Sequence, residues 1–214
     1  MSFSEFIQLN QREIMSSLFQ HLSLVFWAVA FGMIIAVPVG IILSRHRKMA
    51  APVLALVGTI QTIPGLVMLG IALIFWGIGT KPALIVLSLY AILPILRNTY
   101  TGITEINPGY VEAARGIGMT SMQRLFKVEL PIATPTIIGG IRISTVYIIS
   151  WATLAGLIGA GGLGDLIWTG LSTYNTNYIL AGAVPSAIMA VIFNLLIGGL
   201  QRGITPRGLR GVIS

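Results

Sequence analysis

The chain alternates between long uncharged apolar runs and short polar passages. Residues 14–44 and 49–80, for example, contain no charged side chain. About 20 apolar residues are enough to cross the hydrocarbon core of a bilayer. The pattern therefore predicts an all-α integral membrane protein with a single transmembrane domain, residues 18–200. The five predicted transmembrane helices cover about residues 18–43, 50–77, 82–101, 135–158 and 178–200.

The two ends of the chain differ from the predicted spans. Residues 1–17 interleave apolar and charged side chains, which is typical of a short amphipathic helix at the membrane interface. They lack the basic start and the cleavage site of a removable signal peptide. Residues 201–214 carry Arg202, Arg207 and Arg210, and we expect them to form a cytoplasmic tail.

Charge determines the predicted orientation. Only 9% of the residues are charged, against about 25% in a soluble domain, so the net charge of +7 is interpreted as loop charge rather than as nucleic-acid binding. The basic residues gather after the first span, after the third span and at the C-terminus. The positive-inside rule then places the N-terminus outside the cell and the C-terminus in the cytoplasm.

Prolines and polar side chains interrupt the spans. Pro64 removes a helical hydrogen bond and clashes with the preceding turn, so we expect a kink in the second span. Broken helices occur at membrane depth where they line a cavity. We therefore expect the polar or broken positions to line a central route between two protomers. For Trp151, ordinary packing is at least as good an interpretation, and for Ser186, a hydroxyl bonded to its own helix is at least as good. The candidate pathway residues are Gln61, Thr62, Pro64, Pro94, Trp151, Thr153 and Pro185.

One substantial polar passage, residues 107–131, lies between the third and fourth spans. Its sequence predicts two short helices joined by a glycine turn, an arrangement that we call the elbow. The local signals are the helix cap Asn107 with Pro108, the left-handed stop Gly118, the capping box of Thr120 and Gln123, and the expected terminator Pro131.

Several kinds of activity are excluded or disfavoured. No Lys-Ser or Lys-Thr follows the glycine-rich passage 159–164, which is therefore not a phosphate-binding loop. None of the six acidic residues lies within a predicted span, which disfavours coupling to protons or sodium. The chain has no cysteine, and His21 and His46 stand apart from carboxylates, so no metal site is predicted. We expect no enzymatic activity and no bound cofactor.

Residues in the elbow recur at a spacing that resembles a known motif, the EAA loop of ABC importer permeases. They are Glu112-Ala113-Ala114, Gly118, Val128 and Leu130-Pro131. The family usually has Ile where this chain has Val128. In that family the loop is a coupling helix seated in a groove of a separate ATPase. The resemblance implies that the ATPase contacts Gly109, Glu112, Ala113, Ala114, Gly118, Leu130 and Pro131. The alternative, a DNA-binding helix-turn-helix, fits poorly between membrane spans.

Other segments are similar to permeases of osmoprotectant importers, which take up glycine betaine, carnitine or choline. They are Gln61-Thr62-Ile63-Pro64, Leu93 to Tyr100, Trp151 to Leu154, and Gly161-Gly162-Leu163-Gly164-Asp165. The resemblance implies a type I, MetI-like permease in a bacterial cell membrane, forming the pathway with a second permease, identical or homologous. Two ATPase subunits would carry ATP and Mg, and an extracellular binding protein would contact Gly161, Gly162, Gly164 and Asp165. We also expect contact with membrane lipid, and we expect no nucleic-acid partner.

Two alternatives to this function stay open at the level of sequence. An ion-coupled or passive carrier would work without an ATPase. A structural membrane scaffold would transport nothing.

Overall fold

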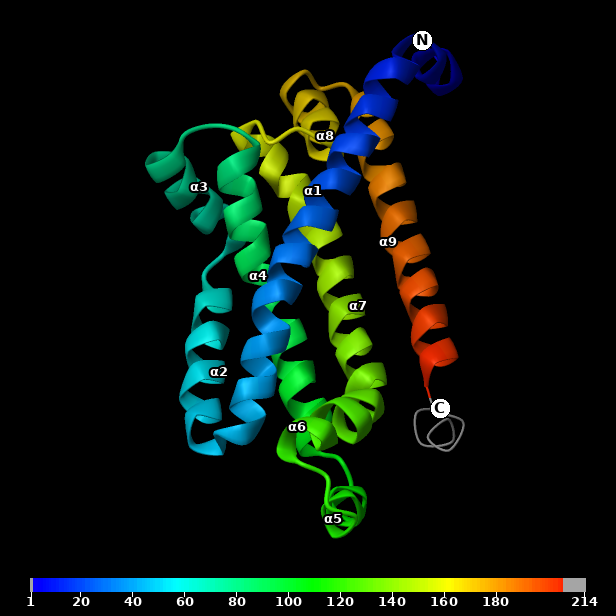
Figure 1. Cartoon of the computed structure of the whole chain (residues 1–214). Helices are drawn as coiled ribbons and strands as arrows, with labels where there is room; N and C mark the ends of the chain where they lie inside the picture. The colour runs from blue at the N-terminus through cyan, green and yellow to red at the C-terminus, as the bar shows by residue number, and fades with distance from the viewer. Residues whose placement is uncertain (1, 206–214) are drawn as a thin grey trace.

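Long helices run side by side through the part of the chain that the structure, a computed structural model, describes, residues 2–205 (Figure 1). They are α1 (Phe3–Arg45), α4 (Thr80–Thr104), α7 (Leu130–Ala155) and α9 (Thr176–Ile204). Beside α4 lie α2 (Arg47–Thr62) and α3 (Gly65–Trp76), and α8 (Leu163–Ser172) lies at the end opposite α5 (Pro108–Gly116) and α6 (Ser121–Arg124). Arg207 and Arg210 of the predicted tail lie outside the described residues.

The described residues contain four helices that are long and apolar enough to cross a membrane. The count becomes five if α2 and α3 together form one broken span, because these two helices are bent by 88° at a short break. Pro64 stands at this break, where the sequence predicts a kink in a single helix. The all-helical membrane fold is confirmed, but the second predicted span, 50–77, consists of two separate helices.

The first helix is longer than expected. A capping box between Ser2 and Glu5 begins α1, which continues for 43 residues, about 65 Å at the rise of an α-helix. Residues 3–17 of the predicted interfacial segment lie in α1, on both sides of a kink at Asn10. Phe6 holds this part against the bundle, because its ring packs edge to face on Tyr178 at 4.8 Å.

Small residues let α1 approach α4 closely. A Cβ atom built on Gly32 would lie 2.7 Å from the Cβ of Ala91, and one built on Gly40 would lie 2.7 Å from the Cβ of Thr99. Ala36, between the two glycines, is fully buried. This spacing of small residues every fourth position is a common way of packing helices within a bilayer.

Polar side chains join α7 to α9. Arg142 Nε donates to Asn194 Oδ1 at 2.7 Å, and Gln201 Nε2 donates to the carbonyl oxygen of Pro135 at 2.9 Å. Such bonds satisfy groups that would otherwise be costly in hydrocarbon.

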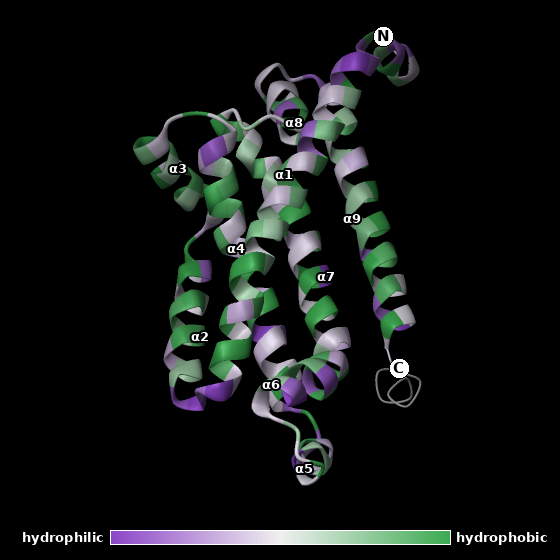
Figure 2. Ribbon diagram, viewed as in Figure 1, coloured by the Kyte–Doolittle hydropathy of each residue, from purple (hydrophilic) through white to green (hydrophobic). Residues whose placement is uncertain are grey.

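Apolar residues also cover the outside of the bundle. Figure 2 shows hydrophobic residues along the long helices, and hydrophilic residues around the turn between α1 and α2 and around α6. Exposed examples are Phe26 on α1, Leu56 on α2 and Leu195 on α9. In water such a surface would be unfavourable, so it is the surface expected of a helix bundle in lipid.

Candidate functional site

The elbow forms as the sequence predicts. Asn107 caps α5 by accepting a hydrogen bond from the backbone N–H of Gly109 at 2.9 Å, and Pro108 begins the helix. Gly118 has φ +79°, the left-handed conformation that favours glycine. Thr120 and Gln123 then form both bonds of a capping box and begin α6. In Figure 1, α5 projects beyond the ends of the long helices.

Most of the predicted ATPase-coupling residues are exposed on this projection. Gly109, Glu112, Ala113 and Gly118 face solvent, as does Pro131, whereas Leu130 is half-buried. Ala114 differs, because its side chain is only 4% exposed and lies inside the elbow. Ala114 therefore supports the elbow from within rather than offering a surface. Four large apolar side chains are exposed beside these residues: Tyr110, Ile117, Met122 and Phe126.

The expectation that Pro131 ends the second helix of the elbow is wrong. The helical path runs from α6 through a π-helical turn, η1 (Leu125–Glu129), directly into α7. The N–H of Leu130 bonds the carbonyl of Leu125, five residues back. This wider turn accommodates the proline ring, which in a regular helix would clash with the carbonyl four residues before it. α6, η1 and α7 therefore form one continuous helical rod, and α5 joins it through the turn at Gly118.

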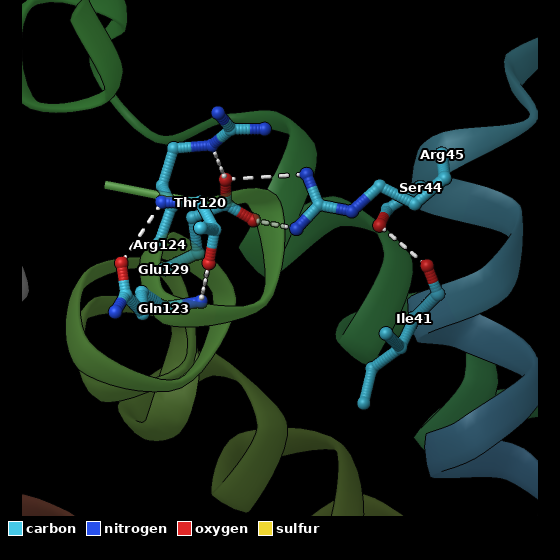
Figure 3. A network of polar contacts seen from close by, with 7 residues as sticks. All are labelled: Ile41, Ser44, Arg45, Thr120, Gln123, Arg124 and Glu129. Atoms are coloured by element: carbon cyan, nitrogen blue, oxygen red, sulfur yellow. Dashed lines mark hydrogen bonds and ion pairs between the residues drawn. The ribbon is translucent and has the colours of Figure 1, made fainter. Parts of the chain in front are cut away.

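An ion-pair network around the buried carboxylate of Glu129 joins this rod to α1 (Figure 3). Glu129 is 2% exposed, and its Oε1 accepts from Arg124 Nε at 2.8 Å and from Arg45 Nη1 at 3.2 Å. Its other oxygen, Oε2, pairs with Arg45 Nη2. Glu129 precedes the predicted span 135–158. Burial by itself would raise the pKa of Glu129, but the hydrogen bonds and charges of Arg45 and Arg124 outweigh it and hold the pKa below its ordinary value.

A polar cavity of about 440 Å³ lies between this network and α5. Its walls come from the ends of α1 and α4, the start of α2, and the elbow. The charged lining residues are Arg45, Arg47, Glu112, Arg115, Arg124 and Glu129.

The second candidate region is the break between α2 and α3, which α4 holds in place. Gln61 Nε2 donates to the carbonyl oxygen of Tyr90 at 2.6 Å, and the hydroxyl of Tyr90 donates to the carbonyl oxygen of Ile63. A helix break leaves backbone groups without helical partners, and the Tyr90 hydroxyl satisfies one of them, the carbonyl of Ile63. The bond from Gln61 ties the end of α2 to α4. Thr62 is exposed and bonds within its own helix to the carbonyl of Thr59.

Trp151 of α7 closes against this break. A Cβ atom built on Gly65 would lie only 1.9 Å from Trp151 Cζ3, so no larger residue fits at position 65 without displacing the indole. The rings of Tyr90 and Trp151 are 5.1 Å apart. Trp151, almost ninety residues further along the chain, thus lies beside the break that contains Pro64 and follows Gln61.

The remaining pathway candidates lie elsewhere. The carbonyl of Thr153 accepts from Trp168 Nε1 of α8 at 3.3 Å. Pro94, within α4, has a carbonyl that accepts from Asn98. Pro185 lies inside α9. Its neighbour Ser186 is buried and bonds the carbonyl of Gly182 in the same helix, so the interpretation as a self-bonded hydroxyl holds for Ser186.

The glycine passage lies at the end of the bundle opposite the elbow. Gly159, Gly161 and Gly162 have φ values of +69°, +80° and +83°. The N–H of Gly162 donates to Gln20 Oε1 of α1 at 3.1 Å, and a Cβ built on Gly164 would lie 2.2 Å from the carbonyl oxygen of Thr153. Both glycines are therefore packing positions within the bundle.

A short helix, α8, follows the glycine passage and was not predicted from the sequence. Asp165 is half-buried in its first turn, where burial raises the pKa of the carboxyl group. Across residues 2–205, no group of three side chains is placed to hold a metal ion.

Sequence reasoning missed Arg45, Glu129, Arg124 and Tyr90. The sequence analysis assigns no site role to any of these four residues. The pairing of Arg124 with Glu129 depends on the π-helical turn between them. The contact of Tyr90 with the break depends on how α4 lies beside α2 and α3. Neither contact is visible in the sequence before the helices are paired.

Together, the bent helix pair, the apolar outer surface and the projecting elbow define a membrane permease. A model of binding-protein-dependent transport system inner membrane components matches residues 17–209, and the chain belongs to this family.

Similar proteins support the same assignment. The chain is 45% identical to the glycine betaine/carnitine/choline transport system permease protein OpuCB of Bacillus subtilis, covering 97% of this chain and 95% of that one. It is 43% identical to the osmoprotectant import permease protein OsmW of Salmonella typhimurium, covering 94% and 96%. A solved structure of the MetNI methionine ABC transporter, inward facing, matches with TM-score 0.83 at 26% identity, covering 96% of this chain and 100% of that one.

Proposed function

We propose that the chain is the permease subunit of an ATP-driven importer for quaternary ammonium solutes such as glycine betaine, carnitine or choline. Curated relatives with these solutes in their names align over nearly the full length of the chain. The observation that carries the proposal is the capped, projecting elbow with exposed apolar residues. A permease that lacks a nucleotide site of its own needs such a surface to receive mechanical work.

The elbow has the surface chemistry of a docking site. Tyr110 is 52% exposed, Ile117 75%, Met122 64% and Phe126 59%, at the end of the bundle where polar residues gather. Apolar side chains exposed on a polar end of the bundle favour a protein partner. We assign this surface to a separate ATPase that binds ATP and Mg; the contact residues are Gly109, Glu112, Ala113, Gly118, Leu130 and Pro131. Each of two permeases would bind one ATPase. Ala114 supports it from within.

Charge supports the cytoplasmic placement of the elbow. The turn between α1 and α2 contains Arg45, Arg47 and Lys48 and lies at the same end of the bundle as the elbow. Positive charge beside spans is retained in the cytoplasm, where ATP is available. The N-terminus, at the other end, would then lie outside a bacterial cell.

The pathway is assigned to the break between α2 and α3, at a contact between this chain and a second permease, identical or homologous. Gln61, Thr62, Pro64 and Trp151 stand at the break, and Pro94, Thr153 and Pro185 are the outlying candidates. The broken backbone offers carbonyl oxygens, and tryptophan and tyrosine rings attract quaternary cations. Cysteine placed at positions 61, 62 and 151 should react with aqueous thiol reagents in some transport state; protection at all three in every state contradicts the pathway.

The outer end is assigned to a binding protein that delivers the solute. Asp165 and Gly161 are partly exposed there, and Tyr174 is 95% exposed. Gly162 and Gly164 are buried and would shape this surface rather than touch the partner.

Reconstitution in proteoliposomes tests the function. With the ATPase inside, the binding protein outside and labelled glycine betaine as the solute, uptake should require ATP hydrolysis. The chain alone, supplied with a sodium or proton gradient, should transport nothing. Gradient-driven uptake by the chain alone would instead identify the ion-coupled carrier. Parallel uptake measurements with labelled choline and carnitine rank the three solutes.

A further inference from the structure

The ion-pair network at Glu129 connects two parts of the fold that are far apart in the sequence, beside an apolar cluster in which Val37 and Ile41 of α1 pack with Leu130. Arg45 stands in the last turn of α1, 84 residues before Glu129, whereas Arg124 belongs to the elbow, five residues before it. The side chain of Glu129 is 3% exposed, that of Arg124 10% and that of Arg45 34%. One carboxylate thus fastens the first long helix to the elbow (Figure 3).

The geometry makes this link stiff. Arg45 donates to both oxygens of Glu129, and a bidentate arginine fixes orientation as well as distance. Arg124 donates to the same carboxylate from its Nε at 2.8 Å. A buried carboxylate that loses a partner keeps the cost of desolvation, so the network resists being pulled apart.

The π-helical turn is what directs Glu129 toward α1. Residues 125–129 contain one residue more per turn than an α-helix, which rotates Glu129 relative to the exposed residues Phe126 and Lys127 of the same turn. Such turns are rare and occur frequently at functional sites. Here the turn lies between α6 and α7, within the elbow.

We propose that Glu129, Arg45 and Arg124 are positioning residues that make α1 move with the elbow when the ATPase moves it. The inference rests on the proposed function, since it specifies how work received at the elbow reaches the bundle. α7 receives the movement through continuous helix, and α1 receives it through the ion pairs, which add a fixed polar link to the apolar packing of Val37 and Ile41. Without Arg45, the elbow would move α7 while α1 lags, so ATP would be hydrolysed with less solute transported.

The test uses Arg45→Gln with Arg47→Gln as its matched control. Arg45→Gln removes only the link to α1, because Arg124 still pairs with Glu129. Arg47 is exposed, lines the same cavity and makes no hydrogen bond or ion pair among the described residues. Both variants lose one positive charge at the same turn. The quantity measured in the reconstituted complex, with ATPase and binding protein, is solute imported per ATP hydrolysed.

Arg45→Gln should lower this ratio, within the range of roughly 2- to 30-fold seen for residues in coupling networks, and Arg47→Gln should leave it unchanged. Uptake and hydrolysis falling together, or the same ratio in both variants, overturns the proposal while the proposed function stands. Wild-type complex without ATP-driven uptake overturns both.

If Arg45→Gln fails to assemble, Arg45→Lys serves as the second variant, because it keeps the charge but not the bidentate contact. Its ratio of solute imported per ATP hydrolysed should be intermediate, and a wild-type ratio overturns the proposal.

Discussion

Replacing Gly118 by alanine isolates the contribution of one backbone conformation to the elbow. Gly118 has φ +79°, and a Cβ atom built on it meets no other atom within 4 Å. The substitution therefore adds no clash, and its cost is the left-handed conformation alone, about 1–2 kcal/mol for a residue with a Cβ. The folded elbow should become about 5- to 30-fold less favoured relative to its open forms.

Gly116→Ala is the matched control. Gly116 also has open space around its Cβ position, but it is the last residue of the α5 helix, with φ outside the left-handed region. The same methyl group there should be neutral or stabilising, by up to about 1 kcal/mol, because alanine favours a helix. The two substitutions, two residues apart, are expected to act in opposite directions.

Hydrogen exchange of the elbow amides in the purified permease measures the effect, and ATP-driven uptake measures its consequence. Gly118→Ala should speed exchange across residues 108–131 and reduce uptake, whereas Gly116→Ala should do neither. Gly118→Asn should fall between wild type and Gly118→Ala, because asparagine tolerates the left-handed region. Equal exchange in Gly118→Ala and Gly116→Ala would refute the reasoning.

Two further predictions concern the break between α2 and α3. Gly65→Ala must displace the indole of Trp151, so it should abolish most uptake. Gly70→Ala should be tolerated, because no atom lies within 4 Å of the Cβ position of Gly70. Equal uptake by the two variants contradicts the close contact. Tyr90→Phe removes the hydroxyl bond to the carbonyl of Ile63 and should cost about 0.5–1.5 kcal/mol, measured as a lower thermal midpoint in detergent; an unchanged midpoint contradicts it.

The elbow was predictable because its signals are local. Asn107, Pro108, Gly118 and the capping box of Thr120 each act on a neighbour within three residues, and each is confirmed. Pro131 was misjudged for a tertiary reason, since a widened turn before it lets the helix continue.

Contacts between distant residues were not predictable from the sequence. Pro64 marks the position of the break, but the 88° bend involves Tyr90 and Trp151 on two other helices. Glu129 is a spacer in the motif until Arg45, 84 residues away, is placed beside it. Patterns of apolar and polar residues define helices; the pairing of helices defines which polar residues meet.

Cross-linking from a single introduced cysteine tests the central claim that the elbow receives the ATPase. The chain contains no cysteine, so Ala113→Cys on the elbow and Thr173→Cys beside α8 each carry one thiol. With a photoactivatable maleimide on that thiol, the account predicts a covalent adduct with the ATPase subunit from position 113 and none from position 173. An adduct from position 173, with none from position 113, would contradict it.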